Sequence, residues 1–289
     1  MIHLGMLMLG LGLSWLWRAQ VRIDSRDTWS QRWQWAWIHF LLPPLFLVMT
    51  ALALAWMGPW GQMAGTGGWF CYGCALALLV LAVGVALHWV WEYGRSCWRT
   101  RLQSLTELDL QGSTAYVLDL EAPFAAQVGV WRSRLVVSRG LLQQLDQEHL
   151  QAVLAHEEAH RYYRDTLWMF GLGWLRRLTG WLPQTETLWQ ELLILRELRA
   201  DRWAAQRVDP LLLGEALLQV VGYGVIEPAT VGWVGFALEM QPDIGQRLQE
   251  RIEALLQEPL AEPLPAFSMG GWAWLSLALL PLLVIPFHA

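Results

Sequence analysis

The side chains best suited to chemistry stand together at His156-Glu157-Glu158-Ala159-His160, which matches the pattern H-E-x-x-H. The surrounding stretch, 147–163, is predicted to form one helix. Residues four apart lie above one another on a helix face, so His156 and His160 can bind one metal ion through two ring nitrogens. Glu157 is on the same turn and can take a proton from a metal-bound water, which makes it the candidate catalytic residue.

Two histidines do not complete a catalytic zinc site, which usually has three protein ligands and one open position. A second helical stretch, from about Thr187 to Arg207, offers Glu197 as the third ligand. Asp201 lies one turn further along the same face, where it can accept the free ring N–H of a ligand histidine. Two histidines and a glutamate are a ligand set of zinc hydrolases, so the sequence predicts a Zn²⁺ cofactor.

An H-E-x-x-H match can also occur by chance on a surface helix. The apolar residues 153–155 argue that this helix is buried, and buried imidazoles and carboxylates need a partner, for which a metal is the simplest choice. Hydrolysis also needs a donor for the oxyanion. Tyr163 and Arg199 are the two candidates, with an ordinary packing or surface role as the alternative for each.

The composition indicates a membrane protein. The chain has 289 residues, of which 55% are hydrophobic and only 16% charged, whereas soluble domains have about 25% charged residues. Its 21 tryptophans are typical of proteins that meet the membrane–water interface. The net charge of −5 comes without a basic stripe, so nucleic acid is not an expected partner.

Four segments are apolar enough to cross a bilayer, and the first is expected to be a retained anchor, because it lacks a basic start and a cleavage site. We therefore expect a mostly α, multi-pass membrane protein with four transmembrane helices and a cytosolic α+β zincin-like catalytic domain with a small sheet. Pro43 and Pro44 are expected to bend the second segment. The predicted spans are 1–17, 36–57, 68–91 and 270–287; the predicted domains are an N-terminal membrane domain (1–93), a catalytic domain (94–266) and a C-terminal membrane span (267–289).

Arginine placement predicts the orientation, since cytoplasmic loops are rich in basic residues. The loop after the first span and the region after the third are the arginine-rich ones, which places 94–266 in the cytosol, at a bacterial inner (plasma) membrane. The apolar stretch 165–183 is not expected to cross, because it contains Arg176 and Arg177, and one crossing there would separate Glu197 from both histidines. The arginines that set the orientation are Arg18, Arg22, Arg26, Arg32, Arg95, Arg99 and Arg101.

Three strands are predicted in the catalytic region, at 114–120, 125–130 and 134–138, with a turn near 131–133 between the last two. The exposed edge of such a sheet can pair with an extended substrate backbone. Asp146 is a candidate N-cap for the H-E-x-x-H helix, and Asp165 for the helix that follows it.

With three spans, H-E-x-x-H, Glu197-Leu198-Arg199-Ala200-Asp201 and a final span, the chain resembles the membrane-bound peptidases of the β-lactam sensor-transducer (BlaR/MecR) family. Residues 124–164 also resemble the HtpX and CAAX prenyl protease families, which share the gluzincin core. The resemblance implies a zinc endopeptidase that cleaves a cytosolic transcriptional repressor, or itself, on a signal. HtpX-like proteins carry spans between the histidines and the glutamate, an arrangement that the argument about 165–183 disfavours.

The sequence is expected to differ from the sensor-transducers in having no penicillin-binding domain. That domain needs a Ser-x-x-Lys motif, and all 20 basic residues of this chain are arginines, so direct acylation by a β-lactam is excluded in this polypeptide. The expected partners are a protein or peptide substrate and the lipid bilayer, and nothing indicates the oligomeric state. Two alternatives stay open: an HtpX-like quality-control protease and a non-catalytic membrane scaffold or receptor that retains the zincin fold.

Overall fold

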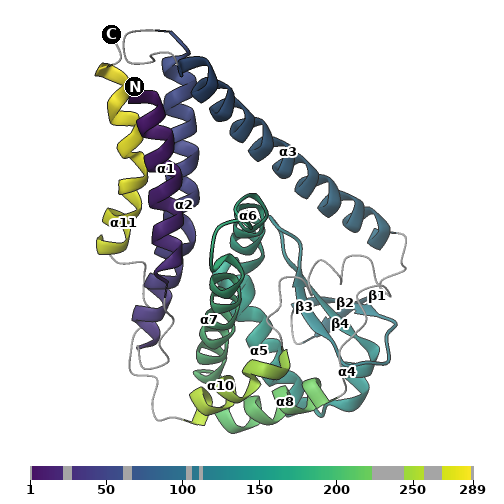
Figure 1. The fold of residues 1–289 in the computed structure, drawn as a ribbon. Coiled ribbons are helices and arrows are strands. Elements are labelled where there is room, and N and C mark those ends of the chain that lie inside the picture. Colours follow the sequence, from purple (N-terminus) through teal and green to yellow (C-terminus); the bar gives the residue numbers. More distant parts are fainter. Residues whose placement is uncertain are drawn as a thin grey trace. The chain divides into compact units, whose positions relative to one another are not determined.

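The structure is a computed structural model that is mostly helical and contains one small sheet (Figure 1). Two compact units alternate along the chain. The first comprises Met1–Trp89, Trp174–Leu192 and Leu264–Ala289, and the second comprises Val90–Gly173 and Leu193–Pro263. The described residues are 2–21, 28–60, 67–101, 106–110, 113–222, 244–256 and 269–287.

The first unit is built around α2 (Trp29–Met57), which packs against α1 (Ile2–Ala19) and against η2 (Leu277–Phe287), a 3₁₀ segment that continues α11 (Met269–Ser276). The helix α2 begins with a capping box, in which the Thr28 hydroxyl accepts the backbone N–H of Gln31. It therefore starts seven residues before the predicted span. It also continues as one helix through Pro43 and Pro44.

Three helical segments are long and apolar enough to cross a membrane: Trp29–Met57, Gly68–Ser96 of α3 (Gly68–Arg101) and Gly270–Phe287. They support integration into a membrane. The predicted first span forms the 18-residue helix α1 but is not among the three. It contains the buried polar residues His3, Ser14 and Arg18, so a fourth crossing stays a prediction. Arg22 and Arg26, used for the orientation, lie outside the described residues.

The segment that was not expected to cross forms α6 (Asp165–Leu178), which has 14 residues. A membrane-spanning helix needs about 17–25 residues, so the length of α6 agrees with that expectation. Residues 179–184 then lead into α7 (Thr185–Ala205), which begins two residues earlier than the sequence predicts.

The sheet of the second unit has the strand order β1-β2-β4-β3, with β1 (Thr106–Leu110) and β3 (Ala125–Val128) at its edges. The central strands, β2 (Ser113–Leu118) and β4 (Arg134–Ser138), are parallel, and each edge strand is antiparallel to its neighbour. The turn between β3 and β4 begins at Gly129, whose φ of 112° is in the region that favours glycine.

Helices cover one face of this sheet. Ala115, Leu135 and Val137 of the central strands share a core with Ala152 and Val153 of α5 (Gln147–Tyr163). This core also includes residues of α4 (Arg139–Gln144) and α8 (Pro210–Gly222), and α8 in turn contacts α10 (Ile244–Leu256). Burial of this apolar face fixes α5 on the sheet, with the edge strand β3 beside it.

Candidate metal centre

The helix α5 begins where the sequence predicts it. The Asp146 carboxylate accepts the backbone N–H of His149 at 2.9 Å, which makes it the N-cap. Further along α5, the side chains of His156, Glu157 and His160 are all buried. Burial of three ionisable side chains on one short stretch is costly without compensating partners.

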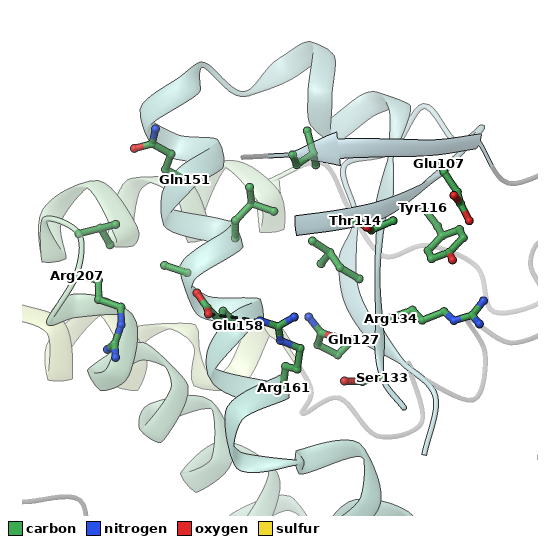
Figure 2. Close-up of a pocket in the computed structure, with 15 residues that line it drawn as sticks. Glu107, Thr114, Tyr116, Gln127, Ser133, Arg134, Gln151, Glu158, Arg161 and Arg207 are labelled. Atoms are coloured by element: carbon green, nitrogen blue, oxygen red, sulfur yellow. Dashed lines mark ion pairs between the residues drawn. The ribbon is translucent and has the colours of Figure 1, made fainter. Parts of the chain in front are cut away.

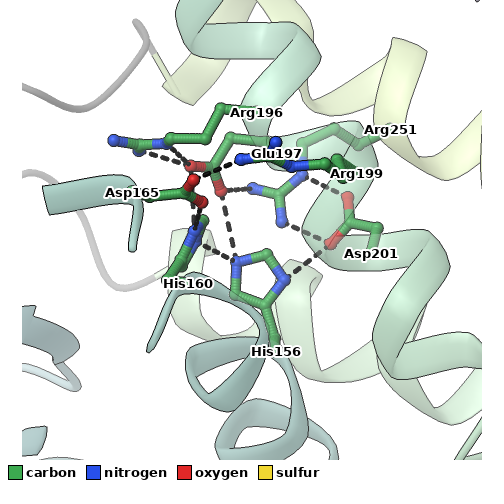
Figure 3. Close-up of polar contacts among 8 residues, drawn as sticks. All are labelled: His156, His160, Asp165, Arg196, Glu197, Arg199, Asp201 and Arg251. Carbon is green, nitrogen blue, oxygen red and sulfur yellow. Dashed lines mark hydrogen bonds and ion pairs between the residues drawn. The ribbon is translucent and has the colours of Figure 1, made fainter. Parts of the chain in front are cut away.

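The helix α7 supplies Glu197, which meets both histidines (Figure 3). One carboxylate oxygen, Oε2, lies 3.2 Å from His156 Nε2, and Oε1 lies 3.6 Å from His160 Nε2. The two Nε2 atoms are 3.1 Å apart. One atom from each of the three residues lies within 4.8 Å of the others, so the predicted ligands converge on a volume that one ion can occupy.

A carboxylate lies behind each imidazole ring. His156 Nδ1 is 2.8 Å from Asp201 Oδ1, and His160 Nδ1 is 2.7 Å from Asp165 Oδ2. The Asp165 carboxylate accepts a hydrogen bond from His160 Nδ1, and Asp201 lies at ion-pair distance from His156 Nδ1, so both Nε2 atoms are turned toward the shared volume. Two neutral rings protonated at Nδ1 would face each other with lone pairs, so a proton or a metal cation has to lie between them.

The charges around the cluster favour this arrangement. Burial alone would lower the pKa of His156, but the hydrogen bond and charge of Asp201 outweigh it and raise that pKa to about 9. A metal ion at this site therefore displaces a proton from His156. Burial would raise the pKa of Glu197, but Arg196, His160 and Arg251 hold it well below its usual value, which keeps this carboxylate ionised and able to bind a cation.

Two residues of the cluster were missed by the sequence reasoning. Asp165 is not an N-cap but the first residue of α6, because Arg164 ends α5 in the left-handed conformation (φ 54°, ψ 42°) and turns the chain back toward His160. An acidic residue five positions after the second histidine, at the joint between two helices, was the available signal. Arg251 of α10 donates to both Asp201 oxygens at 2.7 Å and lies 3.3 Å from Glu197; no sequence spacing relates it to them.

The two candidate oxyanion donors contact each other. The Arg199 guanidinium lies 4.1 Å from the centre of the Tyr163 ring and also donates to the Asp165 carboxylate. These contacts place both side chains beside the carboxylate that holds His160. A role for either in binding an oxyanion stays a prediction.

The residues present suit a zinc ion on two counts. Two imidazole nitrogens and one carboxylate oxygen form a donor set that zinc prefers. In addition, Glu157 Oε2 is buried and has no hydrogen-bond partner among the described residues. A buried oxygen in that state calls for a water or ion nearby, as expected of a carboxylate that faces a metal-bound water.

Comparison with known proteins points the same way. Residues 101–194 match the family model of Peptidase family M48, whereas no solved structure matches the chain. The matched segment includes the sheet and all of α5, and it ends before Glu197. Over this segment the chain is similar to a family of zinc metallopeptidases, and the cluster of His156, His160 and Glu197 is consistent with such a metal centre.

Proposed function

We propose that this protein is an integral-membrane zinc endopeptidase that hydrolyses peptide bonds of a protein substrate. The observation that carries the proposal is the convergence of His156 Nε2, His160 Nε2 and a Glu197 oxygen from two helices. Similarity to Peptidase family M48 over residues 101–194 supports it independently.

In this proposal, His156, His160 and Glu197 would hold the ion, and a zinc ion bound there would polarise the scissile carbonyl and make a neighbouring water more acidic. Glu157 would take a proton from the attacking water and deliver it to the leaving amine. Asp201 and Asp165 orient the imidazole rings and keep their Nδ1 protons in place.

The sheet offers a means to position an extended substrate. The strand β3 lies at one edge of the sheet and contacts α5. The open side of an edge strand has backbone N–H and C=O groups that can pair with another extended chain. A polypeptide bound along β3 would lie next to the H-E-x-x-H helix, which favours an endopeptidase.

We further propose that the catalytic region, 94–266, faces the cytosol of a bacterial inner membrane and acts in regulatory cleavage of a repressor or of the protein itself. The short length of α6 supports this choice over HtpX-like quality control. Without a crossing between His160 and Glu197, all three ligands remain on one side of the bilayer.

The test is the substitution Glu157→Gln in the full-length protein, reconstituted in lipid nanodiscs with zinc. Cleavage of casein should fall about 10²–10⁴-fold, the usual contribution of a general base, while zinc content measured by mass spectrometry stays at the wild-type level. Glu148→Gln, an exposed change in the first turn of the same helix, is the matched control and should leave both quantities unchanged.

Equal cleavage by wild type and Glu157→Gln would refute the catalytic role of Glu157. No cleavage by either, with zinc bound, would favour the non-catalytic scaffold. N-terminal proteomics of cells that contain each form would separate the two cellular roles, since regulatory cleavage yields a few defined sites and quality control yields many.

A further inference from the structure

A large hollow on the second unit is lined by α5 and by residues from both faces of the sheet (Figure 2). Its volume is about 840 Å³. The helix contributes Leu154, Ala155, Glu158 and Arg161 to its wall, and the strands contribute Gln127 and several other residues. The other lining residues include the charged side chains of Glu107, Arg134 and Arg207.

This hollow is separate from the metal centre. Leu154, Ala155, Glu158 and Arg161 are spaced so that they share one face of α5. Successive helical residues are turned by about 100°, which puts His156 and His160 on the opposite face. A molecule bound in the hollow would therefore contact the face of α5 opposite His156 and His160 and would not touch the metal ligands.

Arginines outnumber acidic residues in its wall, where Glu107 and Glu158 are the carboxylates. Arg134, Arg161 and Arg207 line it, and a smaller adjoining hollow of about 230 Å³ shares Arg161 and adds Arg132 and Arg164. These five are a quarter of the 20 basic residues of a chain whose net charge is −5. Among the described residues, only Arg161 of the five forms an ion pair, with Glu158 at 3.5 Å.

Aromatic rings hold two of these arginines in place. The guanidinium of Arg134 lies 5.3 Å from the centre of the Tyr116 ring, and that of Arg207 lies 3.2 Å from the Trp203 ring. Stacking of a guanidinium on an aromatic face orients it and leaves its edge N–H groups available to an anion. The hollow thus presents oriented donors rather than freely moving surface charges.

Gln127 adds a second, independent sign of a ligand. Its side chain is only 9% exposed, it lies in the wall of the hollow on the edge strand β3, and its Oε1 has no hydrogen-bond partner among the described residues. A buried carbonyl oxygen without a donor is costly, so native structures rarely leave one. Whatever fills the hollow is expected to bring an N–H or O–H group to this atom.

We propose that this hollow anchors an acidic segment of the protein that the peptidase cleaves, at a distance from the scissile bond. The carboxylates of the segment would pair with Arg134 and Arg161, and a backbone N–H would donate to Gln127 Oε1. A peptide supplies both from one chain, because its backbone N–H groups recur between acidic side chains. The inference rests on the proposed endopeptidase function for its meaning, but the binding itself does not depend on catalysis.

The test measures binding to the full-length Glu157→Gln protein in uncharged detergent with zinc, so that no peptide is cleaved. Two fluorescein-labelled ten-residue peptides are compared by anisotropy, one alternating Glu and Ala and the other alternating Gln and Ala. The Glu peptide should bind at least about tenfold more tightly, and raising the salt concentration should weaken that binding because ions screen the charges.

Adding Arg134→Glu and Arg161→Glu together should reduce the affinity for the Glu peptide at least about tenfold, because both attractive charges become repulsive. Arg139→Glu is the matched control, since Arg139 is exposed, pairs with Asp119 and lies outside both hollows. It should leave the affinity unchanged. Retained zinc content verifies that each variant is folded, and the milder Arg134→Gln with Arg161→Gln provides a second measurement.

Equal affinity for the two peptides, or the same loss with Arg139→Glu, would overturn the proposal. So would a charge reversal that spares peptide binding but weakens binding to phosphatidylglycerol vesicles, which would assign the arginines to the membrane. Casein cleavage by the wild type tests the peptidase function separately, so each proposal can fail without the other.

Discussion

Glu191 and Glu197 are two buried carboxylates on the helix α7, and their surroundings differ in kind. Glu191 has an ion pair with Arg32, whose Nη2 lies 2.6 Å from Oε1. Glu197 has two arginines nearby and, in addition, two imidazole nitrogens that are both turned toward it by carboxylates behind them. An ion pair compensates the charge of a buried carboxylate, and the two oriented histidines beside Glu197 are the additional feature expected of a metal ligand.

The largest expected effect separates these two glutamates. Glu197→Gln should weaken zinc binding by more than about 100-fold, because it removes a ligand rather than an outer partner of one. Glu191→Gln should retain zinc but destabilise the protein, since removal of one partner of a buried ion pair costs about 3–5 kcal/mol. Zinc titration and thermal unfolding, run on both variants in the same detergent, measure the two effects.

The comparison fails if the two substitutions have the same consequence. Loss of zinc from both would mean that zinc content follows the integrity of α7, and retention by both would mean that Glu197 is not a ligand. The first result would leave the assignment of Glu197 as a ligand without support, and the second would exclude it.

A smaller effect is expected from the carboxylates behind the rings. Asp201→Asn and Asp165→Asn should each weaken zinc binding by about 10–100-fold, the usual consequence of removing a partner of a ligand histidine. Each substitution removes one acceptor of an imidazole N–H and leaves all three ligands in place. Competition with a chelator of known affinity measures the change. An unaltered zinc affinity in both variants would show that the ring orientation does not depend on these two residues.

Local sequence signals predicted much of the structure around the candidate site. The helix of His156 and His160, its N-cap Asp146 and the β3–β4 turn are all present in the structure. Each depends on residues close together in the chain, such as an acidic cap or a glycine with positive φ. The edge strand β1 was missed because it has only five residues, and its Glu107 and Asp109 are of types that are rare in strands.

The long-range part of the site could not be predicted. Arg251 reaches Asp201 across 50 positions of the sequence, and Arg32 reaches Glu191 across 159. No spacing rule relates such residues, and only the packing of whole helices brings them together. Glu197 was proposed as the third ligand that the two histidines need, and Asp201 because it lies one turn further along the same helix face. The contact of Arg251 with both residues was not predicted.

The smallest predicted effect concerns His149, which links the start of α5 to α8. The hydrogen bond to Asp146, reinforced by Glu215 at 3.3 Å, raises the pKa of His149 above its usual value of 6.5. Because the folded pKa is the higher one, its stabilisation is complete below about pH 6.5 and disappears as the pH rises through the folded value. His149→Gln should therefore lower the melting temperature more at pH 6 than at pH 9.

Both acidic partners are exposed, so the contribution of His149 should stay below about 1 kcal/mol. Melting curves of wild type and His149→Gln at the two pH values provide the measurement, and added salt should shrink the difference. A difference that grows as the pH rises would contradict the assigned direction of the pKa.

The central question is which ion the cluster of His156, His160 and Glu197 binds. Zinc X-ray absorption on the purified full-length protein should show two imidazole ligands, light-atom neighbours from Glu197 and water at about 2.0–2.2 Å, and no sulfur ligand. In a variant that combines His156→Ala with His160→Ala, the zinc absorption spectrum should no longer show the two imidazole ligands. Protein that is folded but takes up no zinc, or that binds zinc through sulfur, would contradict the metal centre described for His156, His160 and Glu197.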